Sequence, residues 1–169
     1  MSAPAVFAFN NALVRTPCHA IVDGLRAVDI GAPSYQKVLA EHKAYVEALE
    51  AAGVTVEILP ALDAYPDSMF VEDPALVFTE GAIVMRPGAQ SRFGEAAEIA
   101  PVLRRRFQRV IDLQGPGFAD GGDILVLQDR VMIGWRIGKT YSYEIPKIFF
   151  SIKAIMGATS GDRGPLLVN

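Results

Sequence analysis

Residues 74–84 read Pro74-Ala75-Leu76-Val77-Phe78-Thr79-Glu80-Gly81-Ala82-Ile83-Val84. Two short apolar runs are separated here by three residues, which is an ordinary length for a hairpin connection. The same pattern begins again at Asp123, 49 residues after Pro74, and continues to Ile133. An acidic loop precedes both copies and a helical segment lies between them. A repeat of about fifty residues predicts an array or propeller of small α/β units, although two apolar hairpins can also resemble each other by chance.

The first half of the chain is expected to contain the clearest helix of the sequence. Ser34 is a good N-cap residue, and Gly53 stands where a helix commonly ends. Strands are expected on both sides of this helix, at Ala12–Arg15 and Val54–Leu59. Apolar side chains recur within the helix at three- and four-residue steps and form one stripe of Tyr35, Val38, Leu39, His42, Tyr45, Val46 and Leu49.

A second helix is expected over Gly94–Phe107, inside the repeated pattern. Pro101 interrupts it, and this proline either kinks the helix or restarts it at a first turn. The basic run Arg104-Arg105-Arg106 then falls in the last helical turn, where cations complement the helix dipole. Further strands are expected at Val110–Leu113, Ile124–Leu127 and Val131–Gly134, with a glycine-rich loop at Gln114–Gly122.

Composition limits the classes of function. The chain has 169 residues, of which 51% are hydrophobic and 21% charged, with a net charge of −3, as expected for a soluble globular domain. The sequence contains no stripe of basic residues of the kind that binds nucleic acids. The apolar run Ile145–Met156 is too short to span a membrane and is broken by two lysines. Cys18 is the only cysteine, which excludes an internal disulfide. We therefore expect a cytoplasmic protein without a nucleic-acid or membrane partner.

An acidic stretch, Pro66-Asp67-Ser68-Met69-Phe70-Val71-Glu72-Asp73-Pro74, precedes the first hairpin. Its three carboxylates stand around one aromatic side chain, and prolines bound it at both ends. The planar donors of a guanidinium match carboxylates two at a time, so such a group is the expected guest. The alternative is a Pro-Asp-Ser turn followed by an ordinary Asp-Pro start of a strand.

Five separated motifs occur in order between residues 12 and 135. They are Arg15-Thr16-Pro17, Asp23-Gly24-Leu25, Pro66–Pro74, Arg86–Glu95 and Ala119–Asp123. With these motifs the chain resembles the dimethylarginine dimethylaminohydrolases, which share a guanidine-modifying superfamily with arginine deiminases and amidinotransferases. The resemblance implies an α/β fold, a pentein-like propeller of five ββαβ-type units around a central active site. This chain is expected to form a partial, incomplete propeller.

The resemblance also implies the chemistry. In the family, a cysteine attacks the guanidinium carbon, a histidine shuttles protons, and methylated arginine becomes citrulline and a methylamine through a thiouronium intermediate. No cofactor and no metal are implied. The expected partner is a small molecule, methylarginine or arginine, and a homodimer is possible.

Roles carry over onto the acidic stretch residue by residue. The resemblance implies that Asp73 binds the guanidinium beside the point of attack. Asp67 and Glu72 are expected in the loop that grips the substrate, and Phe70 is expected to pack on the ligand. The alternative for Phe70 is an ordinary core position.

Three further positions receive roles from the other motifs. Arg92 is expected to bind the substrate carboxylate, Asp120 to orient the catalytic histidine, and Leu25 to lie on a mobile lid near the entrance. Arg92 could instead be a surface arginine at the beginning of a helix. Asp120, followed by two glycines, could instead be an ordinary turn former.

The resemblance ends near Trp135. Residues 1–135 are therefore expected to form the first propeller units and residues 136–169 a divergent tail, as in a truncated, frameshifted or spliced member of the family. No histidine or cysteine follows residue 135, and Cys18 beside His19 is not the spatial pair that nucleophilic catalysis needs. We expect an inactive member of a hydrolase family. The alternatives are a non-catalytic guanidine-binding fragment and an arginine deiminase-like enzyme.

Overall fold

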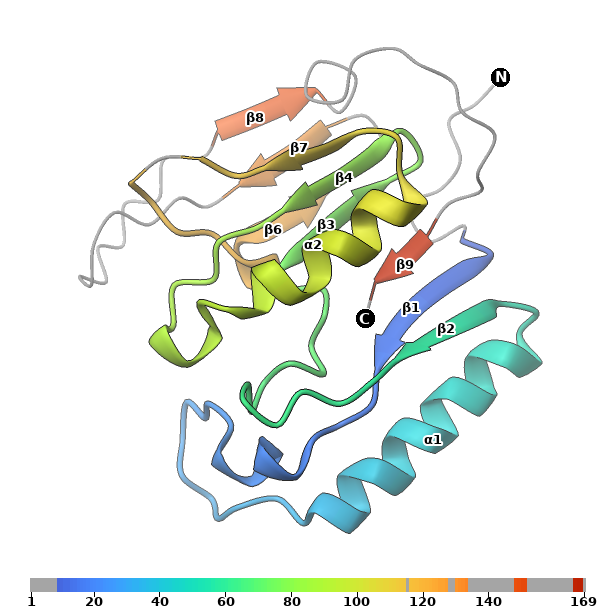
Figure 1. The fold of residues 1–169 in the computed structure, drawn as a ribbon, viewed down its shortest axis with the longest axis vertical. Helices are drawn as coiled ribbons and strands as arrows, with labels where there is room; N and C mark the ends of the chain where they lie inside the picture. Colours follow the sequence, from blue (N-terminus) through green and yellow to red (C-terminus); the bar gives the residue numbers. More distant parts are fainter. Residues whose placement is uncertain (1–8, 115, 128–129, 134–147, 152–165, 169) are drawn as a thin grey trace.

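The structure is a computed structural model that describes residues 9–114, 116–127, 130–133, 148–151 and 166–168. The strands within these ranges form three separate three-stranded sheets. Two α-helices accompany the sheets, one beside the first sheet and one against the second (Figure 1). The predicted α/β class is confirmed, and the described strands do not close into a complete ring.

The first sheet is parallel and has the order β2-β1-β9. Helix α1 connects β1 to β2, as a parallel pair requires. Two of the predicted strands are confirmed to within one residue at their ends. The elements are β1 (Asn11–Arg15), a short 3-10 turn η1 (His19–Asp23), α1 (Tyr35–Ala51), β2 (Thr55–Leu59) and β9 (Leu166–Val168).

Helix α1 has the predicted beginning and end. The hydroxyl of Ser34 accepts a hydrogen bond from the backbone N–H of Lys37 at 3.4 Å, and Gly53 takes a left-handed φ of 84° just after the helix. Glycine adopts that conformation without steric cost. The predicted apolar stripe is buried or half-buried along its whole length, whereas the exposed positions between its members include Glu41, Lys43, Glu47 and Glu50.

The second sheet is the first complete ββαβ unit, with the order β3-β4-β5. Strands β3 and β4 form the predicted antiparallel hairpin, and β5 pairs with β4 in parallel after α2. Helix α2 continues through Pro101 as a single helix, so the proline does not restart it. The elements are β3 (Ala75–Phe78), β4 (Gly81–Val84), a short 3-10 turn η2 (Gln90–Arg92), α2 (Glu95–Arg106) and β5 (Val110–Asp112).

The third sheet repeats the hairpin of the second. Ala75 pairs with Val84 in one hairpin, and Ile124 pairs with Ile133 in the other. Ile124 follows Ala75 by 49 residues, and Ile133 follows Val84 by the same number. This is the spacing of the two sequence motifs, so the repeat is confirmed. The elements are η3 (Gly121–Asp123), β6 (Ile124–Val126), β7 (Arg130–Ile133) and β8 (Ile148–Ser151).

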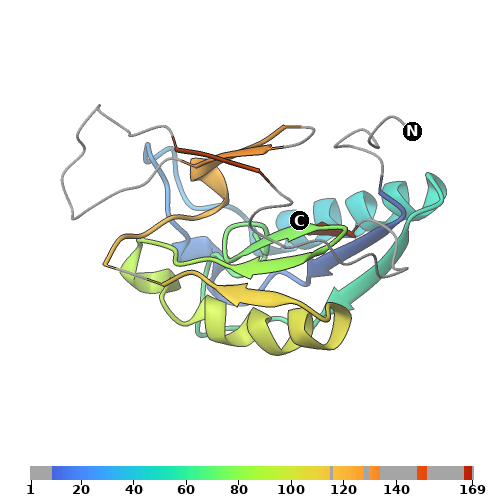
Figure 2. The same ribbon diagram turned by 90° about the horizontal axis from the view of Figure 1, so that it is seen from above.

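Strand β4 contributes to two hydrophobic cores at once. Ala82 and Val84 belong to a cluster with α2, whereas Ile83 and Met85 belong to a cluster with Val131 of β7. Successive side chains of a strand point to opposite faces, so the second sheet is covered on both sides. Figure 2 shows this layering, with α2 on one face of the sheet and the third sheet on the other. A strand buried on both faces reads as a continuous apolar run.

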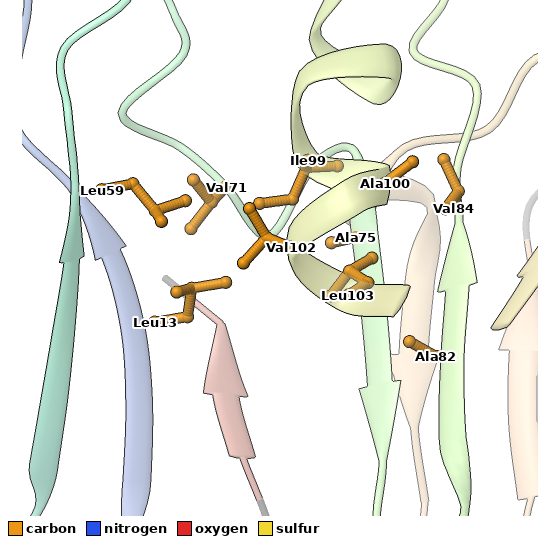
Figure 3. Close-up of a cluster of buried hydrophobic side chains, with 10 residues drawn as sticks. All are labelled: Leu13, Leu59, Val71, Ala75, Ala82, Val84, Ile99, Ala100, Val102 and Leu103. Carbon is orange, nitrogen blue, oxygen red and sulfur yellow. The ribbon is translucent and has the colours of Figure 1, made fainter. Parts of the chain in front are cut away.

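The first core cluster also joins the first two sheets. Leu13 of β1 and Leu59 of β2 meet the inward face of α2, where Leu103 is fully buried (Figure 3). Val71 of the acidic stretch is 1% exposed and belongs to the same cluster. The core therefore fixes the middle of the acidic stretch against the helix.

The predicted tail is described only in part. Strand β8 pairs with β7 and strand β9 with β1, so two short pieces of the tail extend the third and first sheets. Residues 134–147 and 152–165 lie outside the described residues, and the expected boundary at residue 135 stays a prediction. Among the described helices, none combines the length and apolar character needed to cross a membrane.

Candidate functional site

The acidic stretch is a series of tight turns that leads directly into β3. The backbone N–H of Phe70 donates to the carbonyl of Asp67 at 3.0 Å, and that of Asp73 donates to the carbonyl of Phe70 at 3.2 Å. The predicted turn and strand start are therefore both present. They do not exclude a binding role, because the same turns place the carboxylates at one end of the second sheet.

The guanidinium of Arg92 lies at the centre of this region. Arg92 is 7% exposed, and its Nε donates to Oε1 of Glu95 at 3.0 Å. Its Nη2 donates to Oε2 of Glu95 at 2.6 Å and to the carbonyls of Asp67 and Phe70 at 3.1 and 3.2 Å. Its Nη1 donates to the carboxylate of Asp73. Burial alone would lower the pKa of Arg92, but the bonds to Glu95 and Asp73 raise that pKa above its ordinary value. The guanidinium therefore stays charged.

These contacts contradict the alternative interpretation of Arg92. It is not a surface arginine, because it is buried and each of its three nitrogens donates to a protein oxygen. The implied role as a ligand of the substrate carboxylate stays a prediction. In the structure, the arginine binds the acidic stretch itself.

Asp67 connects the acidic stretch to the Asp23-Gly24-Leu25 motif. Its carboxylate is buried at 4% exposure and accepts the backbone N–H of Leu25 at 3.0 and 3.2 Å. A Cβ atom on Gly24 would lie 2.8 Å from Oδ1 of Asp67, so this close approach requires glycine. The Leu25 side chain is 58% exposed. The structure therefore brings these two predicted residues together through the backbone of Leu25.

Asp120 caps a short turn, as its sequence context allowed. Its Oδ1 accepts the backbone N–H of Gly122 at 3.1 Å, and its own N–H donates to the carboxylate of Asp123 at 3.3 Å. The neighbouring Gly121 donates to the carbonyl of Asp73 at 3.2 Å. A Cβ on Gly121 would lie 2.7 Å from the carbonyl oxygen of Glu72. The predicted catalytic loop and the acidic stretch therefore meet, while the role of Asp120 toward a histidine stays a prediction.

Glu72 has a buried carboxylate oxygen beside Asp73. Its Oε2 is buried and has no hydrogen-bond partner among the residues that the structure describes. Burial raises the pKa of Glu72, an effect to which the adjacent Asp73 carboxylate adds. Phe70, two residues away, is 39% exposed, so it is not an ordinary core residue. The expected aromatic neighbour of the carboxylates is therefore present at the surface.

The raised pKa of Glu72 predicts that the stability of the chain depends on pH. Because its folded pKa lies above the ordinary value of 4.5, the native state binds a proton more readily than the unfolded state does. The contribution of Glu72 to the free energy of unfolding should therefore grow as pH falls from neutral through the folded pKa. Glu72→Gln should raise the free energy of unfolding at pH 7 by about 1 kcal/mol and remove this component.

Urea unfolding at a series of pH values measures the effect as the difference between wild type and variant. Glu80→Gln, in the turn between β3 and β4, is the matched control and should leave the pH dependence unchanged. A wild-type minus Glu72→Gln difference that is constant with pH would contradict the prediction.

The cysteine and the two histidines make none of the hydrogen bonds given above for Arg92, although Cys18 lies next to Pro66, the first residue of the acidic stretch. Cys18 is 1% exposed, and its Sγ lies 3.6 Å from the carbonyl oxygen of Tyr65. The His19 ring lies over Tyr35 with 3.9 Å between centroids. His42 lies on the inner side of α1, where burial lowers its pKa, and its Nε2 has no partner within the described part of the chain. Within that part, no three histidine, cysteine or acidic side chains form a group that could hold a metal ion.

Glu95 is the site residue that the sequence did not single out. It is 2% exposed and binds Arg92 at a spacing of three residues. An arginine and a glutamate at that spacing across the beginning of a helix are a usable signal for an ion pair. Nothing in the spacing shows that this pair would be buried.

A family model described as N,N dimethylarginine dimethylhydrolase, eukaryotic, matches residues 24–133. The chain belongs to this family. The match covers the acidic stretch, the Arg92 network and both hairpins, so the dimethylarginine dimethylaminohydrolase resemblance is confirmed over the whole candidate site.

Two curated dimethylarginine dimethylaminohydrolases agree with the assignment. The protein from Pseudomonas aeruginosa is 39% identical over 127 residues, which are 75% of this chain and 50% of the relative. The protein from Streptomyces coelicolor is 41% identical over 139 residues, which are 81% of this chain and 53% of the relative. The chain spans about half the length of the curated relatives it matches.

Solved structures give the same fold. A dimethylarginine dimethylaminohydrolase from Pseudomonas aeruginosa, a cysteine-to-serine variant complexed with citrulline, has a TM-score of 0.73 at 40% identity and matches 76% of this chain and 51% of its own. The N-terminal domain of ArgZ, a cyanobacterial arginine dihydrolase, has a TM-score of 0.59 at 20% identity and matches 67% of this chain and 43% of its own. The second likeness shows the fold alone. The partial pentein-like propeller is therefore confirmed.

Proposed function

We propose that this chain binds the guanidinium group of a methylated arginine or of arginine at the acidic stretch, through Glu72 and Asp73. The observation that carries the proposal is the buried Oε2 of Glu72, which has no partner among the described residues. An uncompensated buried carboxylate is costly, and a planar cation with several donors would satisfy it. The family membership supports a guanidinium as that cation.

Asp73 is the second proposed ligand. Its carboxylate bonds Arg92 through one oxygen, and the side chain is 21% exposed, so a cation can approach it from solvent. Phe70 is proposed to cover the apolar part of the guest, since its ring is exposed beside the same turns. Asp67, Leu25 and Asp120 are proposed to shape the site through their backbone and capping contacts.

The family's reaction is proposed for the complete catalytic assembly rather than for this chain alone. A cysteine thiolate would attack the guanidinium carbon, dimethylamine would leave with a proton, and water would release citrulline from the thiouronium. The single cysteine of this sequence, Cys18, is buried near the carbonyls of Tyr65 and Pro66. We therefore propose binding without turnover for this chain.

Isothermal titration of the 169-residue chain with dimethylarginine and with arginine tests the proposal. Glu72→Gln and Asp73→Asn each keep the side-chain shape and remove a charge, so each should weaken binding at least about tenfold. Glu80→Gln, in the hairpin turn, should change the affinity little. Comparison of the two ligands distinguishes a dimethylargininase-type site from an arginine deiminase-like one.

Two results would contradict the proposed function. Equal and small effects at Glu72, Asp73 and Glu80 would mean that the stretch is only a turn and the start of a strand. Citrulline formation from dimethylarginine, measured by a colorimetric assay, would contradict binding without turnover. Loss of that activity in Cys18→Ser would identify Cys18 as the nucleophile.

A further inference from the structure

Glu95 occupies an unusual place for a carboxylate. It is the first residue of α2 and is 2% exposed. Both of its oxygens accept hydrogen bonds from Arg92, at 3.0 and 3.1 Å from Nε and at 2.6 Å from Nη2. A negative charge in the first turn is favourable to the helix dipole.

The opposite side of the Arg92 guanidinium faces the acidic stretch. There it donates to the carbonyl oxygens of Asp67 and Phe70 and to the carboxylate of Asp73. One planar cation therefore joins Glu95, on the helix, to three oxygens of the stretch. The guanidinium therefore supports both the turns of the stretch and the Asp73 carboxylate.

Arg92 is also a competitor of the proposed guest. A guest guanidinium and the Arg92 guanidinium are the same chemical group, and both require the Asp73 carboxylate. While Glu95 is ionised, it holds Arg92 by two nitrogens and shares its charge. Without the charge of Glu95, Asp73 would be the only carboxylate bonded to Arg92 among the described residues, and the site would lose one negative charge.

Stability alone explains this buried pair poorly. Buried ion pairs can often be replaced by well-packed apolar side chains at no loss of stability, because desolvation offsets most of the attraction. Exposed pairs of the same type are present elsewhere in α2, where Arg104 binds Asp112 at 2.6 Å. The Arg92–Glu95 pair differs because Arg92 also bonds the carboxylate of Asp73, which is a proposed ligand of the guest.

We propose that Glu95 is a positioning residue for the guanidinium site: by holding Arg92, it keeps the Asp73 carboxylate available to a guest cation. The inference rests on the proposed function, since it assigns Glu95 to that same site. Glu95 itself does not touch the guest. Its effect passes through the Arg92 guanidinium.

The test compares two glutamates of the first turn of α2. Glu95→Gln removes the buried charge, and Glu98→Gln removes an exposed one from the same turn. Arginine and citrulline are the two probes, because citrulline has nearly the shape of arginine but a neutral ureido group. Glu95→Gln should raise the Kd for arginine about tenfold and the Kd for citrulline less than about twofold. Glu98→Gln should leave both values unchanged.

A second measurement follows Arg92 directly. In the 169-residue chain, NMR should show slow exchange of the Arg92 Nε proton with water, because this nitrogen is bound to Glu95. Exchange should become at least about tenfold faster in Glu95→Gln and stay slow in Glu98→Gln. A purely structural role of Glu95 would lower the affinities for both probes by the same factor.

Several outcomes would overturn the inference. Equal losses for arginine and citrulline, or unchanged exchange of the Arg92 proton, would overturn the positioning role alone. Weakened arginine binding in Glu72→Gln together with unaltered binding in Glu95→Gln would do the same. A wild-type chain that binds no arginine would overturn the proposed function and this inference with it.

Discussion

Arg92→Met is expected to lower the free energy of unfolding by about 3–5 kcal/mol, the usual cost of removing one partner from a buried ion pair. Methionine fills much of the volume of arginine but donates no hydrogen bonds. The substitution leaves the buried carboxylate of Glu95 without its counter-charge, and it removes the side-chain donor from the carbonyls of Asp67 and Phe70, which keep only their backbone donors. Urea denaturation, followed by circular dichroism, measures the change.

The matched control is Arg104→Met. Arg104 also pairs with a carboxylate, that of Asp112, but both side chains are nearly half exposed. Exposed pairs contribute less than about 1 kcal/mol, so this variant should unfold almost as wild type does. Equal losses in the two variants would show that the Arg92 guanidinium does not hold the acidic stretch in place.

Leu103→Ala is expected to lower the free energy of unfolding by about 2–5 kcal/mol, because the substitution leaves a cavity in a closely packed core. Leu103 is fully buried on α2, in the cluster that joins the first two sheets (Figure 3). The loss should therefore affect both sheets. Thermal unfolding observed by near-ultraviolet circular dichroism, which reports on side-chain packing, measures it.

Leu125→Ala provides the comparison for Leu103. Leu125 lies on β6 with 49% of its surface exposed, so its truncation should change the free energy of unfolding by less than about 0.5 kcal/mol. A large effect at Leu125 and a small one at Leu103 would contradict the assignment of the main core to the cluster around Leu103.

The regular elements could be predicted from the sequence because their signals are local. The N-cap of α1, the glycine after it and the apolar stripe all lie within twenty residues. The two hairpins share a period, and their pairing registers differ by the same 49 residues as their sequences. Pro101 was expected to kink or restart the helix, and the structure shows one helix across it. The packing of α2 in the first core cluster maintains a helix that the proline locally disfavours.

The sequence could predict which segments form the candidate site but not how their side chains contact one another. Acid residues and glycines mark the stretch and its neighbouring loops, and the structure brings those loops together. The burial of Arg92 could not be read from its surroundings in sequence, because its acceptors come from residues 67–73 and from Glu95 across a turn. The positions of β8 and β9 in their sheets could not be predicted either. Strand β9 pairs with β1, which lies at the other end of the chain. Strand β8 pairs with β7 across residues that lie outside the described ranges.

The double-faced strand β4 limits how this chain can change during evolution. Its side chains Ala82 and Val84 face α2, whereas Ile83, together with Met85 directly after the strand, faces the third sheet. An insertion or deletion of one residue would exchange the two sets, which would crowd the helix and hollow the opposite core. Insertions and deletions are therefore expected in the connecting loops. Within the strand, only substitutions that preserve the side-chain volume on each face are expected.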